Sequence, residues 1–119
     1  MKIVMPWPDK KLTTNAKRRK HWRIYNPAIK ADRQRGYDET LAQTPYAAAR
    51  KALKGNALIA CQVTFYPPDR RRRDDDGMIA AFKHMRDGIC DALQIDDVRL
   101  RPHYVIAEPE APGRVEVVI

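Results

Sequence analysis

The sequence predicts an α+β fold: one small domain, residues 1–119, in which a mixed β-sheet packs against helices. Short runs rich in β-forming residues lie near both ends of the chain and in its middle. A long amphipathic helical pattern lies between two of these runs. We find no internal repeat and no linker. Hydrophobic residues make up 44% and charged residues 32%, a balance typical of a folded globular domain.

The first half of the chain predicts one strand, one loop and two helices. Residues 2–7 form a strand that prolines end. Residues 9–23 are cationic without apolar periodicity and predict a loop. Asn26-Pro27 predicts a helix start, because Asn caps and Pro suits the first helical position, and the helix continues over 28–41. Residues 46–53 predict another helical stretch.

The second half predicts three strands and one helix. Residues 57–66 have the strongest β-forming composition. From Asp76 or Gly77 to Leu93, apolar residues at spacings of three and four form one stripe: Met78, Phe82, Met85, Ile89 and Leu93. Residues 98–107 predict a strand with Pro102 at an edge or bend, and 114–119 a closing strand. These last two strands can pair as a hairpin.

Charge and cysteine content narrow the partners and the compartment. The net charge of +8 favours a polyanionic partner, most commonly nucleic acid, although a basic protein without such a partner remains the alternative. Cys61 and Cys90 match no zinc spacing, and each lies in an apolar run, so we expect buried free thiols. No run approaches the roughly 20 apolar residues of a membrane span. We therefore expect a cytoplasmic protein that binds no membrane.

The most distinctive stretch is the charged block at residues 68–76, Pro-Asp-Arg-Arg-Arg-Arg-Asp-Asp-Asp. Unpaired charges are very costly to bury, so the block must lie at the surface. Arginines can hold phosphates, while clustered aspartates can hold a divalent metal that activates water against a phosphodiester. This combination predicts a metal-dependent nuclease.

The metal ligands are predicted among two acidic groups. Asp74 and Asp76 stand two residues apart, so their carboxylates can point the same way while Asp75 points elsewhere. Asp96 and Asp97 follow the predicted helix, and one of them completes the site if that helix returns the chain to the same end of the sheet. The alternative is that these acids only cap helices or face solvent, as acidic pairs in turns usually do.

Two further features have competing interpretations. Lys83 lies on the predicted helix and can contact the scissile phosphate, but it can equally be a solvent-facing lysine paired with Asp87. The segment 10–23 interleaves cations with His21, Trp22 and Tyr25, which suits phosphate contacts with stacking on exposed bases. The alternative is a solvated basic loop that Trp22 anchors to the core.

The charged block, the helix after it and Asp96-Asp97 closely resemble the RusA family of Holliday-junction resolvases, small phage and prophage endodeoxyribonucleases. The N-terminal Met5-Pro6-Trp7-Pro8, followed by Asn15 and the basic aromatic segment, resembles that family's first motif. The resemblance covers nearly the whole chain in order. It implies a RusA-like fold and a homodimer that makes paired nicks in a four-way DNA junction with Mg²⁺ or Mn²⁺, in DNA recombination and repair.

The resemblance also implies roles for individual residues. The family's three essential aspartates fall on Asp74, Asp76 and Asp97 as catalytic metal ligands. Many members have a lysine where this chain has Ala80, and Lys83, one helical turn further on, can take that role. Gly77 replaces a common Asn. DNA contacts are expected from both basic stretches, namely Arg70, Arg71, Arg72, Arg73, Asn15, Lys17, Arg18, Arg19, Lys20, Trp22 and Arg23. No small-molecule cofactor is expected.

Two other functions stay open at the level of sequence. One is a non-catalytic nucleic-acid-binding module, in which the aspartates only balance the arginines. The other is a less selective metal-dependent nuclease that acts on branched DNA or on RNA. A cleavage assay on junction and linear duplex, with and without magnesium, separates the three.

Overall fold

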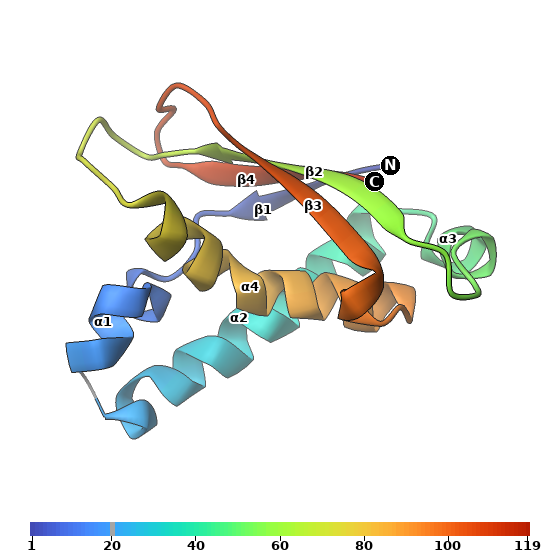
Figure 1. Ribbon diagram of the computed structural model, residues 1–119, viewed down its shortest axis with the longest axis horizontal. Coiled ribbons are helices and arrows are strands. Elements are labelled where there is room, and N and C mark those ends of the chain that lie inside the picture. Colours follow the sequence, from blue (N-terminus) through green and yellow to red (C-terminus); the bar gives the residue numbers. More distant parts are fainter. Residues whose placement is uncertain (20) are drawn as a thin grey trace.

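The structure, a computed structural model, describes residues 1–19 and 21–119 and confirms the α+β class. Helices lie against one side of a twisted sheet (Figure 1). In the described part of the chain the elements are β1 (Lys2–Pro6), the 3₁₀ helix η1 (Lys10–Leu12), α1 (Thr14–Arg19), α2 (Trp22–Gln43), α3 (Tyr46–Ala52), β2 (Ile59–Tyr66), α4 (Asp75–Leu93), η2 (Asp97–Arg99), β3 (Leu100–Ile106) and β4 (Arg114–Val118).

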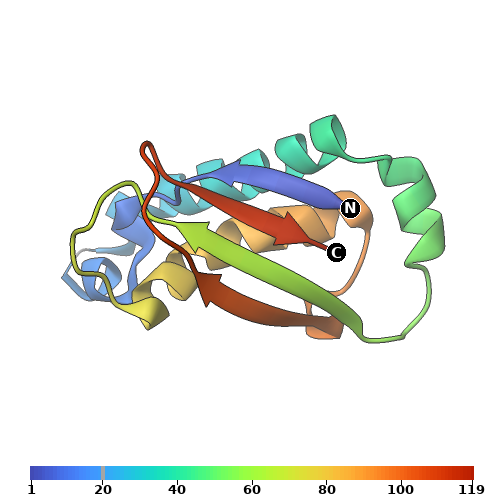
Figure 2. The same cartoon turned by 90° about the horizontal axis from the view of Figure 1, so that it is seen from above.

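The sheet is mixed and has the strand order β1-β4-β2-β3. Strand β4 runs antiparallel to both β1 and β2, whereas β3 runs parallel to β2. The predicted pairing of the last two strands is therefore wrong, because β2 lies between them (Figure 2). A strand that follows a helical crossover from β2 must start where β2 starts, so it adds in parallel. Pro102 lies in the edge strand β3, as predicted.

The core lies between the sheet and helix α4. Alternate residues of the strands face the helices, among them Met5, Val63, Phe65 and Val115, and all are buried. The predicted apolar stripe on α4 is confirmed, since its five residues Met78, Phe82, Met85, Ile89 and Leu93 are buried against these strands. Burial of each such side chain contributes about 1.5–3 kcal/mol.

Helices α2 and α4 pack against each other at two glycines. A Cβ atom added to Gly36 would lie 2.1 Å from the carbonyl oxygen of Met85, and one added to Gly88 would lie 2.0 Å from that of Arg33. Only glycine allows the two backbones to approach so closely. This contact fixes α2 beneath α4 (Figure 1).

The predicted start of α2 at Asn26-Pro27 is wrong, because the helix begins at Trp22. The His21 ring accepts a hydrogen bond from the Arg23 N–H at 3.2 Å and caps the helix in place of Asn. Pro27 lies inside the helix, where its missing N–H removes one hydrogen bond.

The expectation of a loop over residues 9–23 is also wrong, because this segment contains η1 and α1. Asp9 caps η1 by accepting from the Lys11 N–H, and Leu12 is fully buried against Ala28 and Ala81. One buried leucine anchors the segment without any apolar repeat, so periodicity could not reveal it. Among the described residues, no helix has the length and apolar content to cross a membrane.

Candidate metal and nucleic-acid site

The aspartates of the charged block lie at the N-terminus of α4. Asp74 caps the helix, and its carboxylate accepts a hydrogen bond from the Asp76 N–H at 3.1 Å. Asp75 and Asp76 occupy the first turn, where carboxylates interact favourably with the helix dipole. All three side chains are exposed and border one open depression together with Arg72 and Arg73. The structure thus brings Asp74 and Asp76 together at the surface.

Asp75 also borders a second depression, toward the end of β3 at Ile106, which Asp74 and Asp76 do not border. Asp75 therefore borders this second depression as well as the one it shares with Asp74 and Asp76. Two carboxylates, a substrate phosphate oxygen and waters match the way proteins usually hold Mg²⁺. Within residues 1–19 and 21–119, however, no three His, Cys, Asp or Glu side chains lie close enough to share a metal. A single chain therefore supplies a carboxylate pair rather than a complete three-carboxylate site.

Asp97 lies at the other end of α4, in η2, far from Asp74 and Asp76 (Figure 1). A helix of 19 residues is about 28 Å long at 1.5 Å per residue. The expected return to the same end of the sheet does not occur, because α4 carries the chain back to the start of β2, where Ile59 pairs with Leu100. The neighbouring Asp96 caps η2 by accepting from the Val98 N–H at 3.1 Å.

Lys83 lies on the solvent face of α4 and forms an ion pair with Asp87 at 3.1 Å. It stands two helical turns from Asp76, a rise of about 10 Å along the axis. In this arrangement its ammonium group is directed to Asp87 rather than to the carboxylate pair.

The four arginines of the charged block do not behave alike. The side chain of Arg73 is only 19% exposed, and its guanidinium lies over the ring of Trp7, 5.6 Å from the centroid. It also pairs with the Asp69 carboxylate at 2.9 Å and donates to the carbonyls of Asp69 and Arg71. Because its donors are used within the loop, Arg73 shapes the loop rather than facing DNA.

The other three arginines of the block point into solvent. Arg70 is 83% exposed and makes one long contact, 3.4 Å, with Glu108. Arg71 and Arg72, which precede Arg73 in the chain, are exposed. These guanidinium groups are available to phosphates beside the carboxylate pair.

The basic N-terminal segment is divided in a similar way. Lys17, on α1, lies with its Nζ atom 2.9 Å from Nε2 of His84 on α4. Burial, and then the charge of Lys83, lower the pKa of Lys17. Burial, and then the charge of Lys17, lower the pKa of His84 to about 4. Lys17 therefore holds α1 against α4.

Three of the remaining predicted DNA contacts of this segment, Arg18, Trp22 and Arg23, have described side chains. Arg18 and Arg23 are exposed, and Trp22 is 53% exposed beneath the guanidinium of Arg23. Trp22 does not anchor the segment to the core, since Leu12 does so. Asn15 and Arg19 belong to α1, but their side chains, like the whole of Lys20, lie outside the described residues.

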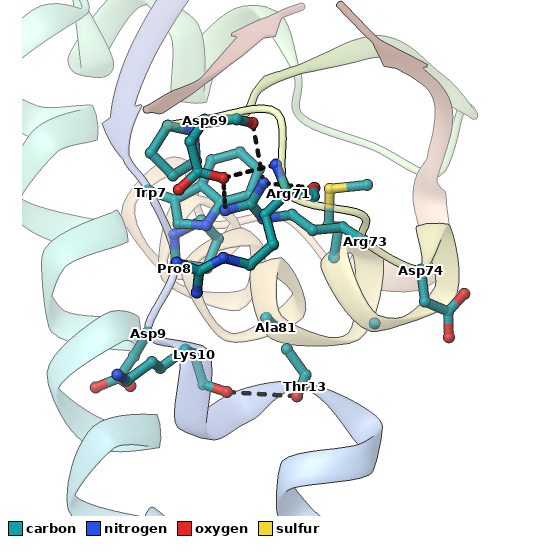
Figure 3. Close-up of a pocket in the computed structure, with 13 residues that line it drawn as sticks. Trp7, Pro8, Asp9, Lys10, Thr13, Asp69, Arg71, Arg73, Asp74 and Ala81 are labelled. Atoms are coloured by element: carbon teal, nitrogen blue, oxygen red, sulfur yellow. Dashed lines mark hydrogen bonds and ion pairs between the residues drawn. The ribbon is translucent and has the colours of Figure 1, made fainter. Parts of the chain in front are cut away.

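A cavity of about 420 Å³ lies beside the carboxylate pair and was not predicted (Figure 3). It is formed by the segment after β1, by the loop between β2 and α4 (residues 67–74, the arginine loop) and by the start of α4. Its lining is mainly apolar, with cations at the edge: Trp7, Pro8, Asp9, Lys10, Thr13, Pro68, Asp69, Arg71, Arg73, Asp74, Gly77, Met78 and Ala81. The motif Met5-Pro6-Trp7-Pro8 contributes Trp7 and Pro8 to the wall of the cavity. The cavity forms only where this motif meets the arginine loop, which is distant in the chain, so the motif alone could not reveal it.

Asp32 is a buried residue near the cavity that was not predicted from the sequence. Its side chain on α2 is 1% exposed, pairs with Arg35 at 2.7 Å and accepts from the Asp9 N–H at 3.2 Å. Burial raises the pKa of this carboxyl, although its partners oppose the shift. Asp32 thereby ties the segment after β1 to α2 behind the cavity. The signal was the spacing of Ala28, Asp32, Gly36 and Thr40, which places a carboxylate on the buried face.

A protein of Xylella fastidiosa (strain Temecula1), named "Uncharacterized protein", is 41% identical to this chain over 122 residues. The match covers 98% of this chain and 72% of the Xylella protein. This chain belongs to the same family as that protein. No protein-family model matches the chain. The name of the Xylella protein gives no activity.

Proposed function

We propose that this protein is a magnesium-dependent endonuclease that cuts four-way DNA junctions as a homodimer. The observation that carries the proposal is the exposed pair Asp74 and Asp76, which lies in the same charged block as the three exposed arginines Arg70, Arg71 and Arg72. The net charge of +8 and the RusA-like order of motifs support a DNA substrate. Resolution needs two symmetric cuts, which a two-fold dimer provides.

The geometry of one chain also favours a dimer. The carboxylate pair lies at one end of α4 and Asp97 at the other, so a site with all three requires two chains. A two-fold axis that passes through the middle of the edge strand β3 would place each end of this strand beside the opposite end of the same strand in the partner subunit. Ile106 lies near Asp75, and Val98 follows Asp97, so this axis brings Asp97 of the partner subunit toward the carboxylate pair.

Exposed apolar side chains lie where this dimer would need them. Val98, in η2 just before β3, is 65% exposed, and Ile106, the last residue of β3, is 45% exposed. The same axis would bring Val98 of one subunit against Ile106 of the partner subunit. Both side chains would then lose contact with water, which favours association. A bound magnesium ion at such a site would activate water and stabilise charge on the phosphate. Arg70, Arg71 and Arg72 would hold the flanking phosphates.

The test compares the wild-type protein with Asp76→Asn on labelled junction and linear duplex of the same sequence, with and without magnesium. We expect paired nicks in the junction only with wild type and magnesium, and junction binding without cleavage by Asp76→Asn. Full cleavage by Asp76→Asn would sink the site assignment. Binding without any nick by the wild-type protein would instead favour the non-catalytic module, in which Asp74 serves only as the helix cap. Equal cutting of duplex would favour the less selective nuclease.

A further inference from the structure

The cavity beside the carboxylate pair has a lining that phosphate binding does not explain. Its walls include Trp7, Pro8, Pro68 and Met78, which offer no charge to an anion. Phosphate sites are built from cations and backbone N–H groups, whereas apolar walls of this kind take up a flat, weakly polar group. A volume of about 420 Å³ falls within the range of small-molecule sites.

The cations lie where a nucleic-acid strand would need them. Lys10, in η1, and Arg71, in the arginine loop, are exposed and belong to opposite walls of the cavity. Arg73 is fixed against Trp7 and Asp69 and borders the cavity (Figure 3). Arg73 thus holds the Trp7 wall of the cavity in place, and the exposed Lys10 and Arg71 can hold the phosphates on either side of a base.

The cavity is also placed correctly relative to the proposed chemistry. Asp74 borders both the cavity and the open depression of the carboxylate pair, and Figure 3 shows its carboxylate directed away from the cavity. A phosphate at the carboxylates therefore leaves the neighbouring nucleoside next to the cavity mouth. We propose that the cavity receives one unstacked nucleobase of the strand that is cut. This inference rests on the proposed nuclease function and adds a base-binding pocket to it.

Gly77 provides a matched pair of variants for the test. It lines the cavity, and a Cβ atom added to it would make only ordinary contacts, with Thr13 and Asp74 at 3.7–4.0 Å. Gly77→Leu should therefore fill the cavity while the fold is retained, and Gly77→Ala should leave it open. Thermal unfolding of both variants checks the fold before DNA is added.

The experiment measures binding and magnesium-dependent cleavage of junctions in which each nucleotide near the cut is replaced in turn by an abasic analogue. We expect one position where the wild-type protein loses roughly 5- to 150-fold in affinity, the equivalent of 1–3 kcal/mol of base stacking. Gly77→Leu should show the same loss of affinity on the intact junction. The abasic analogue at that one position should cause this variant no further loss. Gly77→Ala, which fills less of the cavity, should lose less affinity for the intact junction than Gly77→Leu.

Four results would overturn the proposal. A flat abasic scan, or normal cleavage of intact junction by Gly77→Leu, excludes the base pocket while the nuclease function stands. A flat scan combined with a weaker Gly77→Leu dimer assigns the cavity to a side chain of the partner subunit instead. Failure of the wild-type protein to bind or cut the intact junction removes the proposed function itself, and the pocket with it.

Discussion

The guanidinium of Arg73 lies over the ring of Trp7, although 66 positions of sequence separate the two residues. The contact joins the segment after β1 to the arginine loop, and the Asp69 carboxylate holds the same guanidinium at 2.9 Å. One arginine of the charged block therefore builds the site, while its neighbours face the solvent.

Arg73→Ala should lower the free energy of unfolding by about 1–2 kcal/mol, since it removes a cation–π contact and several hydrogen bonds. The matched change Arg72→Ala should leave stability unchanged. It should weaken DNA binding instead and reduce the slope of log K against log salt by about 1. Urea denaturation and salt-dependent binding measure the two effects. Equal behaviour of the two variants in both assays would contradict this division of roles.

Two inactive variants should restore activity to each other. Consider a heterodimer of an Asp76→Asn chain with an Asp97→Asn chain. If each site is shared between subunits, one of its two sites carries both substitutions and the other carries neither. We expect each homodimer to be inactive, and the heterodimer, purified with two different tags, to nick one strand of the junction. If each site lies within one chain, the heterodimer stays inactive, which would refute the shared site.

Alanine substitution should be costly at the two glycines of the helix contact and harmless at Gly77 of α4. Gly36→Ala and Gly88→Ala place a Cβ atom within 2.1 Å of a backbone oxygen, so α2 and α4 must separate. We expect each to destabilise the fold by about 2–4 kcal/mol. Gly77→Ala, in the same helix as Gly88, should be neutral or stabilise by up to about 1 kcal/mol. Thermal melts of the three variants provide the comparison, and a mild Gly88→Ala would exclude the close contact.

The contact of Lys17 with His84 should make stability depend on pH. The pKa of His84 is lowered from 6.5 to about 4 in the folded protein, so the unfolded state binds the proton more readily. Its contribution to stability is therefore full above pH 6.5 and is lost as the pH falls toward 4. The groups that face this ring are Lys17 of α1, Arg33 of α2, and Lys83 and Asp87 of α4.

His84→Gln should flatten the decline in stability between pH 7 and pH 5 relative to the wild type. His103→Gln, at an exposed position on β3, serves as the control and should leave the decline unchanged. Denaturation at several pH values gives the result. An identical pH profile for His84→Gln and the wild-type protein would rule out this linkage.

Local patterns were enough to predict most of the elements. The β-forming run that became β2, the stripe from Met78 to Leu93 and the exposed charged block each depend on neighbouring residues alone, and the structure agrees with all three. The start of α2 and the helix α1 were missed, because His21 as a cap and one buried leucine are weak local signals.

The sequence by itself determined the fold class, the composition of the charged block and the proximity of Asp74 to Asp76, since these follow from residues that are neighbours in the chain. The tertiary structure alone decided that Asp97 lies at the far end of α4. The helix connects two parallel strands, so it must carry the chain back to the end of the sheet where β2 starts. It alone decided that Arg73 turns inward, since Trp7 reaches it only through the sheet. Trp7 and Arg73 both border the cavity. It too depends on the tertiary structure, because the three segments that form it are distant in sequence and meet only when the chain folds.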